Sequence, residues 1–174
     1  MFVIRSARTD ESAALRAIEW SAGEQFREFG LDAIADAEPA SIEVLAAYAA
    51  DGRSWVAVDA GDQPIGYVIA DSVDGNAHIE QVSVLPEHQG RGVGRALIDR
   101  VHAWAAETDR PALTLTTFSH IPFNGPLYAH LGFRVLPDAE IGPELRAIRE
   151  TETAHGLDPE TRVCMRRDLG AGGG

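Results

Sequence analysis

The residues best suited to proton transfer in this chain are a histidine and a glutamate in one predicted strand, and a tyrosine further on. His78 and Glu80 are two residues apart, so their side chains project from the same face of the strand. Either group could take a proton from an attacking nucleophile, and the phenol of Tyr128 could protonate a leaving group. Because a glutamate ordinarily titrates near ~4.3, Glu80 needs burial or a relaying water to act as a base.

A glycine-rich run, Gln89–Gly94, follows the same strand and precedes an amphipathic helix. Such a loop points backbone N–H groups outward at the positive end of a helix dipole, where they bind phosphate. The dinucleotide fingerprint G-x-G-x-x-G fails, because Arg95 stands at the position of the third glycine. The P-loop pattern fails as well, because no Lys-Ser or Lys-Thr follows Gly94. The spacing therefore disfavours both nucleotide folds.

Two motifs in sequence carry a resemblance to a known family. The loop reads Q-x-x-G-x-G, and Tyr128–Phe133 after it reads Y-x-x-x-G-F. With Val82–Val84 before the loop, the chain resembles the GNAT superfamily of N-acetyltransferases. The resemblance implies that acetyl-CoA is the co-substrate and that its pyrophosphate lies on the loop. Its pantetheine arm would pair with a strand edge that is exposed where two central strands splay apart. No metal is expected, because the six histidines of the chain show no metal-ligand spacing.

The resemblance implies a role for each catalytic candidate. Glu80 would be the base, acting through water, and His78 could share that role, because arylalkylamine acetyltransferases carry His-x-His at this place. Tyr128 would be the general acid that protonates the CoA sulfur. The main-chain N–H of Val84 would face the thioester carbonyl as the oxyanion donor. The alternatives from the residues alone are an ordinary polar strand residue for Glu80 or His78 and a core tyrosine for Tyr128.

The cofactor-binding residues are implied in the same way. The family often has an asparagine seven residues before the tyrosine, where this chain has Ile121. Asn124 is four residues before it, and as it precedes Gly125-Pro126 it is also a candidate helix N-cap. The cofactor-binding set is Val82, Ser83, Val84, Gln89, Gly90, Arg91, Gly92, Val93, Gly94, Arg95 and Asn124.

Composition narrows the class of protein further. At 174 residues and 45% hydrophobic content, the chain predicts one domain over residues 3–168, with a disordered tail at 169–174. A net charge of -12 argues against nucleic acid and an anionic membrane surface as partners. The early charge at Arg5 argues against a signal peptide, and the single cysteine, Cys164, excludes an internal disulfide. We expect a cytoplasmic enzyme, and the sequence leaves open whether it forms a homodimer.

The elements that must position these residues alternate between strands and helices. We expect strands at 2–7, 55–58, 64–70, 77–85, 112–118, 133–136 and 162–167. Helices are expected after an N-cap at Thr9, from Ser41, and over 94–107, 124–132 and 143–155. The fold class is therefore α/β (α+β). With the resemblance, it is the GNAT fold, a mixed central sheet of six to seven strands flanked by helices and splayed at its two central parallel strands.

The acceptor is left open by the sequence. The resemblance implies transfer onto an amine, either a small cationic amine or a peptide amine. A transferase of a bulkier acyl group and a CoA-binding sensor without turnover are the alternatives. Nine acidic residues between Asp10 and Ala50, against two arginines, could form a solvated helical face or attract a cation.

Overall fold

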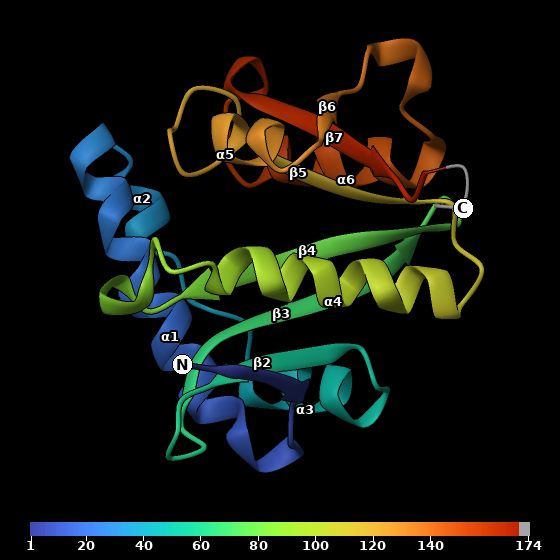
Figure 1. The fold of residues 1–174 in the computed structure, drawn as a ribbon. Coiled ribbons are helices and arrows are strands. Elements are labelled where there is room, and N and C mark those ends of the chain that lie inside the picture. The colour runs from blue at the N-terminus through green and yellow to red at the C-terminus, as the bar shows by residue number, and fades with distance from the viewer. Residues whose placement is uncertain (171–174) are drawn as a thin grey trace. The chain divides into compact units, whose positions relative to one another are not determined.

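The computed structural model describes residues 1–170 and contains one mixed sheet (Figure 1). The strands are β1 (Val3–Ser6), β2 (Ser54–Val58), β3 (Pro64–Val73), β4 (Asn76–Val84), β5 (Ala112–Phe118), β6 (Arg134–Val135) and β7 (Arg162–Asp168). They lie in the order β1-β2-β3-β4-β5-β7-β6. β4 and β5 run parallel, whereas β1 with β2, β2 with β3, β5 with β7 and β7 with β6 are antiparallel pairs. The predicted mixed sheet of six to seven strands is confirmed.

The helices follow the predicted order. They are α1 (Ser12–Gly23), α2 (Asp32–Ala35), α3 (Ile42–Ala50), α4 (Val93–Glu107), α5 (Gly125–His130) and α6 (Pro143–Ala154). The cap of α3 is confirmed, since the Ser41 hydroxyl accepts a hydrogen bond from the Val44 N–H at 3.2 Å. The predicted cap at Thr9 is wrong. A short 3-10 turn precedes α1, and the Glu11 carboxylate accepts the Arg8 N–H there instead. None of the described helices is long and apolar enough to cross a membrane.

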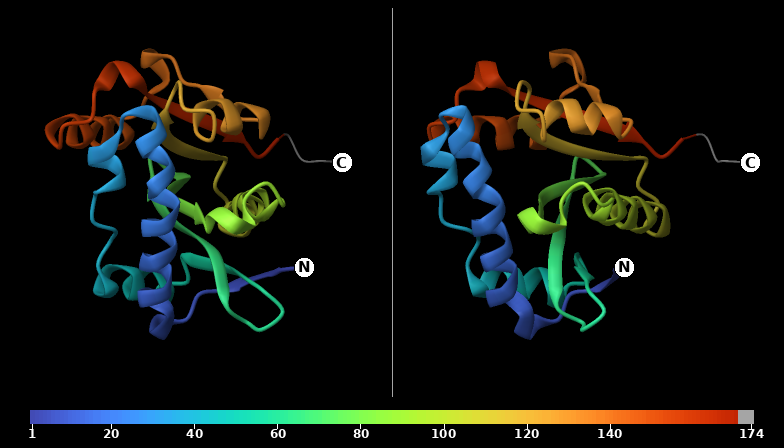
Figure 2. Two further views of the ribbon diagram at one scale, coloured as in Figure 1. Left: turned by 90° about the vertical axis from the view of Figure 1, so that its left-hand side faces the viewer. Right: turned by 60° about the vertical axis from the view of Figure 1, so that its left-hand side comes forward.

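The chain divides into two compact units, and β4 and α4 each contribute to both. The first unit holds Met1–Ala70 and Ile79–Val101, and the second holds Asp71–His78 with the chain from His102 onward. In the first unit, α1 and α3 lie on one face of β2 and β3, and the first part of α4 lies on the other (Figure 2). Leu15, Leu45 and Tyr67 are among the buried residues between those helices and strands. Burial of this apolar face stabilises the unit.

A glycine in β3 lets helix α4 approach the sheet. A Cβ atom on Gly66 would lie 3.1 Å from the Ser83 carbonyl oxygen and 3.2 and 3.3 Å from side-chain carbons of Val93 and Leu97. Those distances are tighter than normal packing, so a larger residue would push α4 away. Because α4 begins directly after the glycine-rich loop, Gly66 helps to fix where that loop lies.

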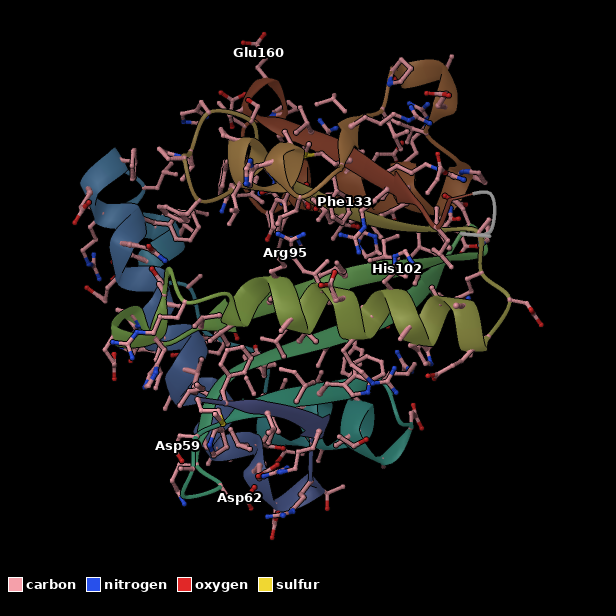
Figure 3. All side chains as sticks on the ribbon, in the orientation of Figure 1. Asp59, Asp62, Arg95, His102, Phe133 and Glu160 are labelled. Atoms are coloured by element: carbon pink, nitrogen blue, oxygen red, sulfur yellow. The ribbon has the colours of Figure 1, made fainter. Side chains whose placement is uncertain are left out.

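The β2–β3 hairpin is closed by two aspartates that lie in the turn (Figure 3). The Asp59 carboxylate accepts hydrogen bonds from the N–H groups of Gly61 and Gln63, at 2.9 and 3.0 Å. Asp62 adopts a left-handed φ of 59° and forms an ion pair with Arg5 on β1. The turn is therefore stabilised by its own aspartate and is also tied to the neighbouring strand.

In the second unit, the turn before β4 caps a helix that lies far away in the sequence. The Asp74 carboxylate accepts hydrogen bonds from the N–H groups of Glu144 and Leu145 at 2.9 and 3.0 Å. In return, the Glu144 carboxylate accepts the Asp74 N–H at 3.2 Å. The exchange is a reciprocal capping box built from two segments that are 70 residues apart. It satisfies backbone N–H groups at the start of α6.

Three local expectations need correction or qualification. The strands expected at 64–70 and 77–85 are separated by a shorter turn, because β3 continues to Val73 and β4 begins at Asn76. Asn124 precedes α5 but does not cap it through its side chain, which donates to the Phe123 carbonyl instead. In the predicted tail, the Leu169 N–H donates to the Pro111 carbonyl at 3.0 Å, and residues 171–174 lie outside the described residues.

Candidate functional site

The glycine-rich loop connects β4 to α4 within the first unit. A 3-10 turn, Pro86–His88, comes first, and α4 begins at Val93. Gly90 and Gly92 adopt φ values of +73° and +83°, which other residues rarely reach. No atom lies within 4 Å of a Cβ built on either glycine, so the outer side of the loop is open. An open loop of this kind at the start of a 15-residue helix can accept an anion on its backbone N–H groups.

The remaining predicted cofactor residues are split between buried and exposed positions. Arg91 and Arg95 are exposed, and Arg95 lies in the first turn of α4 (Figure 3). Val93 is buried and contributes its side chain to the core. Ser83 is also buried, and its hydroxyl accepts a hydrogen bond from the Gln81 side chain at 2.9 Å. The side chains of Val93 and Ser83 are therefore structural, and only their main-chain groups could meet a cofactor.

The end of β4 is tied to the loop by a side chain. The Gln89 amide donates a hydrogen bond to the Val84 carbonyl oxygen at 3.1 Å. The resemblance implies an exposed strand edge for pantetheine, and in the structure this carbonyl of β4 already has a partner. A carbonyl oxygen can accept a second hydrogen bond, so Val84 keeps part of its acceptor capacity. Gln89 thus has a structural role in the motif, since it holds the loop against the strand.

The two candidates for the base differ in exposure. Glu80 is exposed on β4 in the first unit. His78 belongs to the second unit and is only 2% exposed, with its Nδ1 atom 2.9 Å from the Thr114 hydroxyl on β5. Burial lowers the pKa of His78 to about 4, although the charges of Asp71, Glu152 and Asp74 oppose that shift. A histidine in these surroundings is neutral at pH 7 and is a weak base.

Tyr128 lies on α5 in the second unit, and it is half-buried. Burial raises the pKa of Tyr128 to about 12, and the positive charge of Arg162 opposes the shift. The phenol therefore carries its proton at neutral pH, as a general acid must. Arg162 carries no signal in the sequence. In the structure it pairs with Glu152 at 2.9 Å and also donates a hydrogen bond to the Thr116 hydroxyl.

Comparison with known proteins identifies the family to which these residues point. Residues 50–135, which contain Glu80, the loop and Tyr128, match the family described as acetyltransferase (GNAT) domain. The chain belongs to the GNAT superfamily of N-acetyltransferases. The peptidyl-lysine N-acetyltransferase YjaB of Salmonella typhimurium is 25% identical over 142 residues, which cover 81% of this chain and 89% of that protein.

Solved structures share the GNAT fold at lower identity. A GNAT-family acetyltransferase from Staphylococcus aureus has a TM-score of 0.72 and 15% identity, over 98% of this chain and 100% of that one. The PaiA N-acetyltransferase from Thermoplasma acidophilum, solved in complex with coenzyme A, has a TM-score of 0.68 and 12% identity. That match covers 97% of this chain and 99% of the other. At these identities the likeness shows the fold alone.

The single cysteine of this GNAT domain is buried in β7. Burial raises the pKa of Cys164, although a hydrogen bond from Arg149 to its sulfur opposes the shift. A thiol with a raised pKa is a poor nucleophile, because the thiolate is the reactive form. Cys164 is therefore a packing residue of β7.

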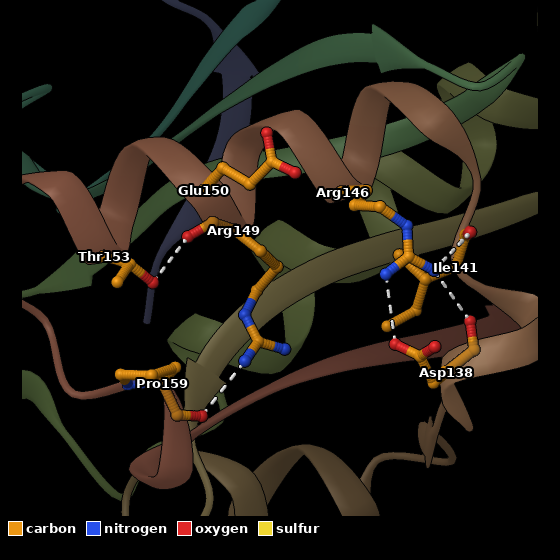
Figure 4. Close-up of a pocket in the computed structure, with 7 residues that line it drawn as sticks. All are labelled: Asp138, Ile141, Arg146, Arg149, Glu150, Thr153 and Pro159. Atoms are coloured by element: carbon orange, nitrogen blue, oxygen red, sulfur yellow. Dashed lines mark hydrogen bonds and ion pairs between the residues drawn. The ribbon is translucent and has the colours of Figure 1, made fainter.

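A hollow of about 340 Å³ lies beside α6 in the second unit, and none of the predicted site residues lines it (Figure 4). Four of its polar side chains, those of Asp138, Arg146, Arg149 and Thr153, bond to one another or to nearby backbone. Arg146 pairs with Asp138 at 3.1 Å, and Arg149 donates to the Pro159 carbonyl at 3.1 Å. Because these donors already have partners, the hollow does not match the phosphate or amine chemistry of the GNAT motifs.

Proposed function

We propose that this GNAT protein transfers an acetyl group from acetyl-CoA directly to a primary amine, on a small cationic compound or a peptide. The observation that carries the proposal is the loop between β4 and α4, whose Gly90 and Gly92 leave its outer side open for a phosphate. The coenzyme A in the PaiA complex and the peptidyl-lysine activity named for YjaB support the co-substrate and the amine acceptor.

Each candidate has one task in the proposed reaction. The loop and Arg95 hold the pyrophosphate, and the Val84 N–H donates to the thioester oxygen as negative charge develops there. The amine nitrogen attacks the carbonyl carbon and gives up a proton to Glu80 through water. The C–S bond then breaks, and Tyr128 supplies a proton to the departing sulfur. The exposure of Glu80 and the burial of His78 favour Glu80 as the base.

The proposal includes a cytoplasmic location. Its support is that the chain has one cysteine, buried in β7, and therefore carries no internal disulfide of the kind that oxidising compartments favour.

The test is thiol release from acetyl-CoA in the presence of a panel of amines. The panel should contain alkyl diamines, polyamines and peptides with a free lysine or N-terminal amine. Binding of CoA is measured separately by calorimetry. We expect binding together with amine-dependent release of CoA. Binding without release from any acyl-CoA would favour the sensor, and release only from longer acyl-CoA would favour the bulkier acyl group.

A further inference from the structure

A glutamate on α1 is held in place by a buried tyrosine. The Tyr67 hydroxyl, on β3, donates a hydrogen bond to Glu19 Oε2 at 3.0 Å, and the Ala40 N–H also bonds to this carboxylate. Tyr67 is fully buried, whereas Glu19 is only partly buried. Tyr67 therefore cannot reach a substrate itself, but it fixes a carboxylate that is partly exposed.

The Glu19 carboxylate is partly desolvated and has no ion-pair partner among the described residues. Burial raises the pKa of Glu19, and the hydrogen bonds from Tyr67 and Ala40 and the charge of Arg16 oppose the shift without cancelling it. The Arg16 guanidinium is bonded elsewhere, to the Ala40 carbonyl and the Glu38 carboxylate, at 2.9 and 3.0 Å. Within residues 1–170, Glu19 takes part in no ion pair. A desolvated carboxylate of this kind is stabilised when a cation joins it.

The candidate base lies near the same phenol. Burial raises the pKa of Tyr67, and the negative charges of Glu19 and Glu80 both add to the shift. Glu19 on α1 acts on the phenol through its hydrogen bond, and Glu80 acts on it from β4, the strand beside β3 in the sheet. All three residues belong to the first unit, so the arrangement is internal to that unit.

We propose that Glu19 makes the enzyme select cationic acceptors. It binds the ammonium group of the incoming amine as its counter-ion and holds that group beside Glu80, which then takes the proton. Tyr67 is a positioning residue that acts through Glu19. This inference rests on the proposed function, since it assigns the acceptor-binding residue of the same site.

The first experiment compares Glu19→Gln with Glu28→Gln, which removes an equal charge from an exposed position nearby. The glutamine can still accept the Tyr67 hydrogen bond, so we expect the fold to persist. For an alkylamine that is cationic at the assay pH, KM should rise about 10- to 100-fold in Glu19→Gln, as loss of a charged hydrogen bond implies. Its kcat should stay within about twofold of wild type. The KM for an arylamine that is neutral at the same pH should not change.

A second variant tests the positioning role. Tyr67→Phe removes the donor to Glu19 but leaves both carboxylates, so KM for the cationic amine should rise and kcat should change little. In the double variant Tyr67→Phe with Glu19→Gln, the two effects should not add, because Tyr67 acts only through Glu19. Additive effects would show that Tyr67 contributes by packing alone.

Stability provides a readout that does not depend on turnover. Since the native pKa of Glu19 is raised, its ionisation opposes folding, and the wild type loses stability as pH rises past the ordinary glutamate range. Glu19→Gln should therefore have a Tm at pH 8 equal to or above that of wild type. An active wild type whose Glu19→Gln variant keeps its KM would overturn this inference alone. A wild type that binds CoA but acetylates no amine would overturn the proposed function as well.

Discussion

The ring of Tyr128 meets the ring of Phe133 edge to face, with centroids 5.8 Å apart and planes at 68°. Both residues belong to the Y-x-x-x-G-F motif, and Gly132 between them adopts a φ of +93° that turns the chain back. The Phe133 N–H then donates to the Tyr128 carbonyl at 3.0 Å. The motif thus fixes the orientation of the tyrosine through its own phenylalanine, within five residues of sequence.

The role of Tyr128 as the general acid can be tested by removing its hydroxyl group. Tyr128→Phe keeps the edge-to-face contact and removes the hydroxyl. We expect kcat to fall roughly 10²-fold, since general acid catalysis contributes about 10²- to 10⁴-fold. Affinity for CoA, measured by calorimetry, should change little. Wild-type kcat in this variant across the pH range would make Tyr128 a packing residue.

The loop can be tested at one glycine. Gly92→Ala places a methyl group on the open side of the loop and forces a φ near +83° that alanine resists. We expect CoA to bind at least about tenfold more weakly, with the change in dissociation constant measured by calorimetry. Gly156→Ala is the matched control, since Gly156 also has a positive φ, at +93°, with open space around it, but lies after α6. An equal loss of affinity in both variants would point to general strain instead of phosphate contact.

The base can be identified from pH–rate profiles. Glu80→Gln preserves shape and removes basicity, so the acidic limb of kcat/KM should move to higher pH, where the amine deprotonates by itself. His78→Gln should leave that limb in place, because the histidine is buried and weakly basic. The reverse result, a normal limb in Glu80→Gln and a lost limb in His78→Gln, would exchange the two roles.

His78 should also affect stability in acid. Burial lowers its native pKa from 6.5 to about 4, so between these values the unfolded chain binds more protons than the folded chain. Stability should therefore fall as pH drops from 6.5 to 4, by up to about 1.4 kcal/mol per pH unit. Urea unfolding at several pH values should show a smaller slope for His78→Gln than for wild type. Equal slopes would mean that the ring titrates normally.

The order of elements could be read from the sequence because each signal is local. The strand at 112–118, the helix from Ser41 and the glycine-rich loop depend on periodicity, a cap and glycine spacing within a few residues. The cap at Thr9 failed because a 3-10 turn over Thr9–Glu11 precedes α1, so that Thr9 lies inside the turn and not at its boundary. Whether such a turn precedes a helix depends on local geometry that composition does not show.

The site was predictable only where a motif marks it. Glu80, the loop and Tyr128 stand in recognisable patterns, whereas Glu19 is one of nine acidic residues between Asp10 and Ala50 and carries no local signal. What distinguishes Glu19 is a hydrogen bond from Tyr67, which is 48 residues away. The hydrogen bond from the Gln89 amide to the Val84 carbonyl likewise depends on the direction of a side chain, which the sequence does not show.

The capping box between Asp74 and α6 constrains when this helix can form. An isolated helix of 12 residues is marginal in water, and here the groups that satisfy its first N–H donors are in a turn made 70 residues earlier. During synthesis the turn leaves the ribosome long before the helix does. The Asp74 carboxylate therefore has no helix to cap until the intervening chain has been made. Formation of α6 is therefore a late, long-range step, and damage to the turn at Asp74 should slow folding at a distant point in the chain.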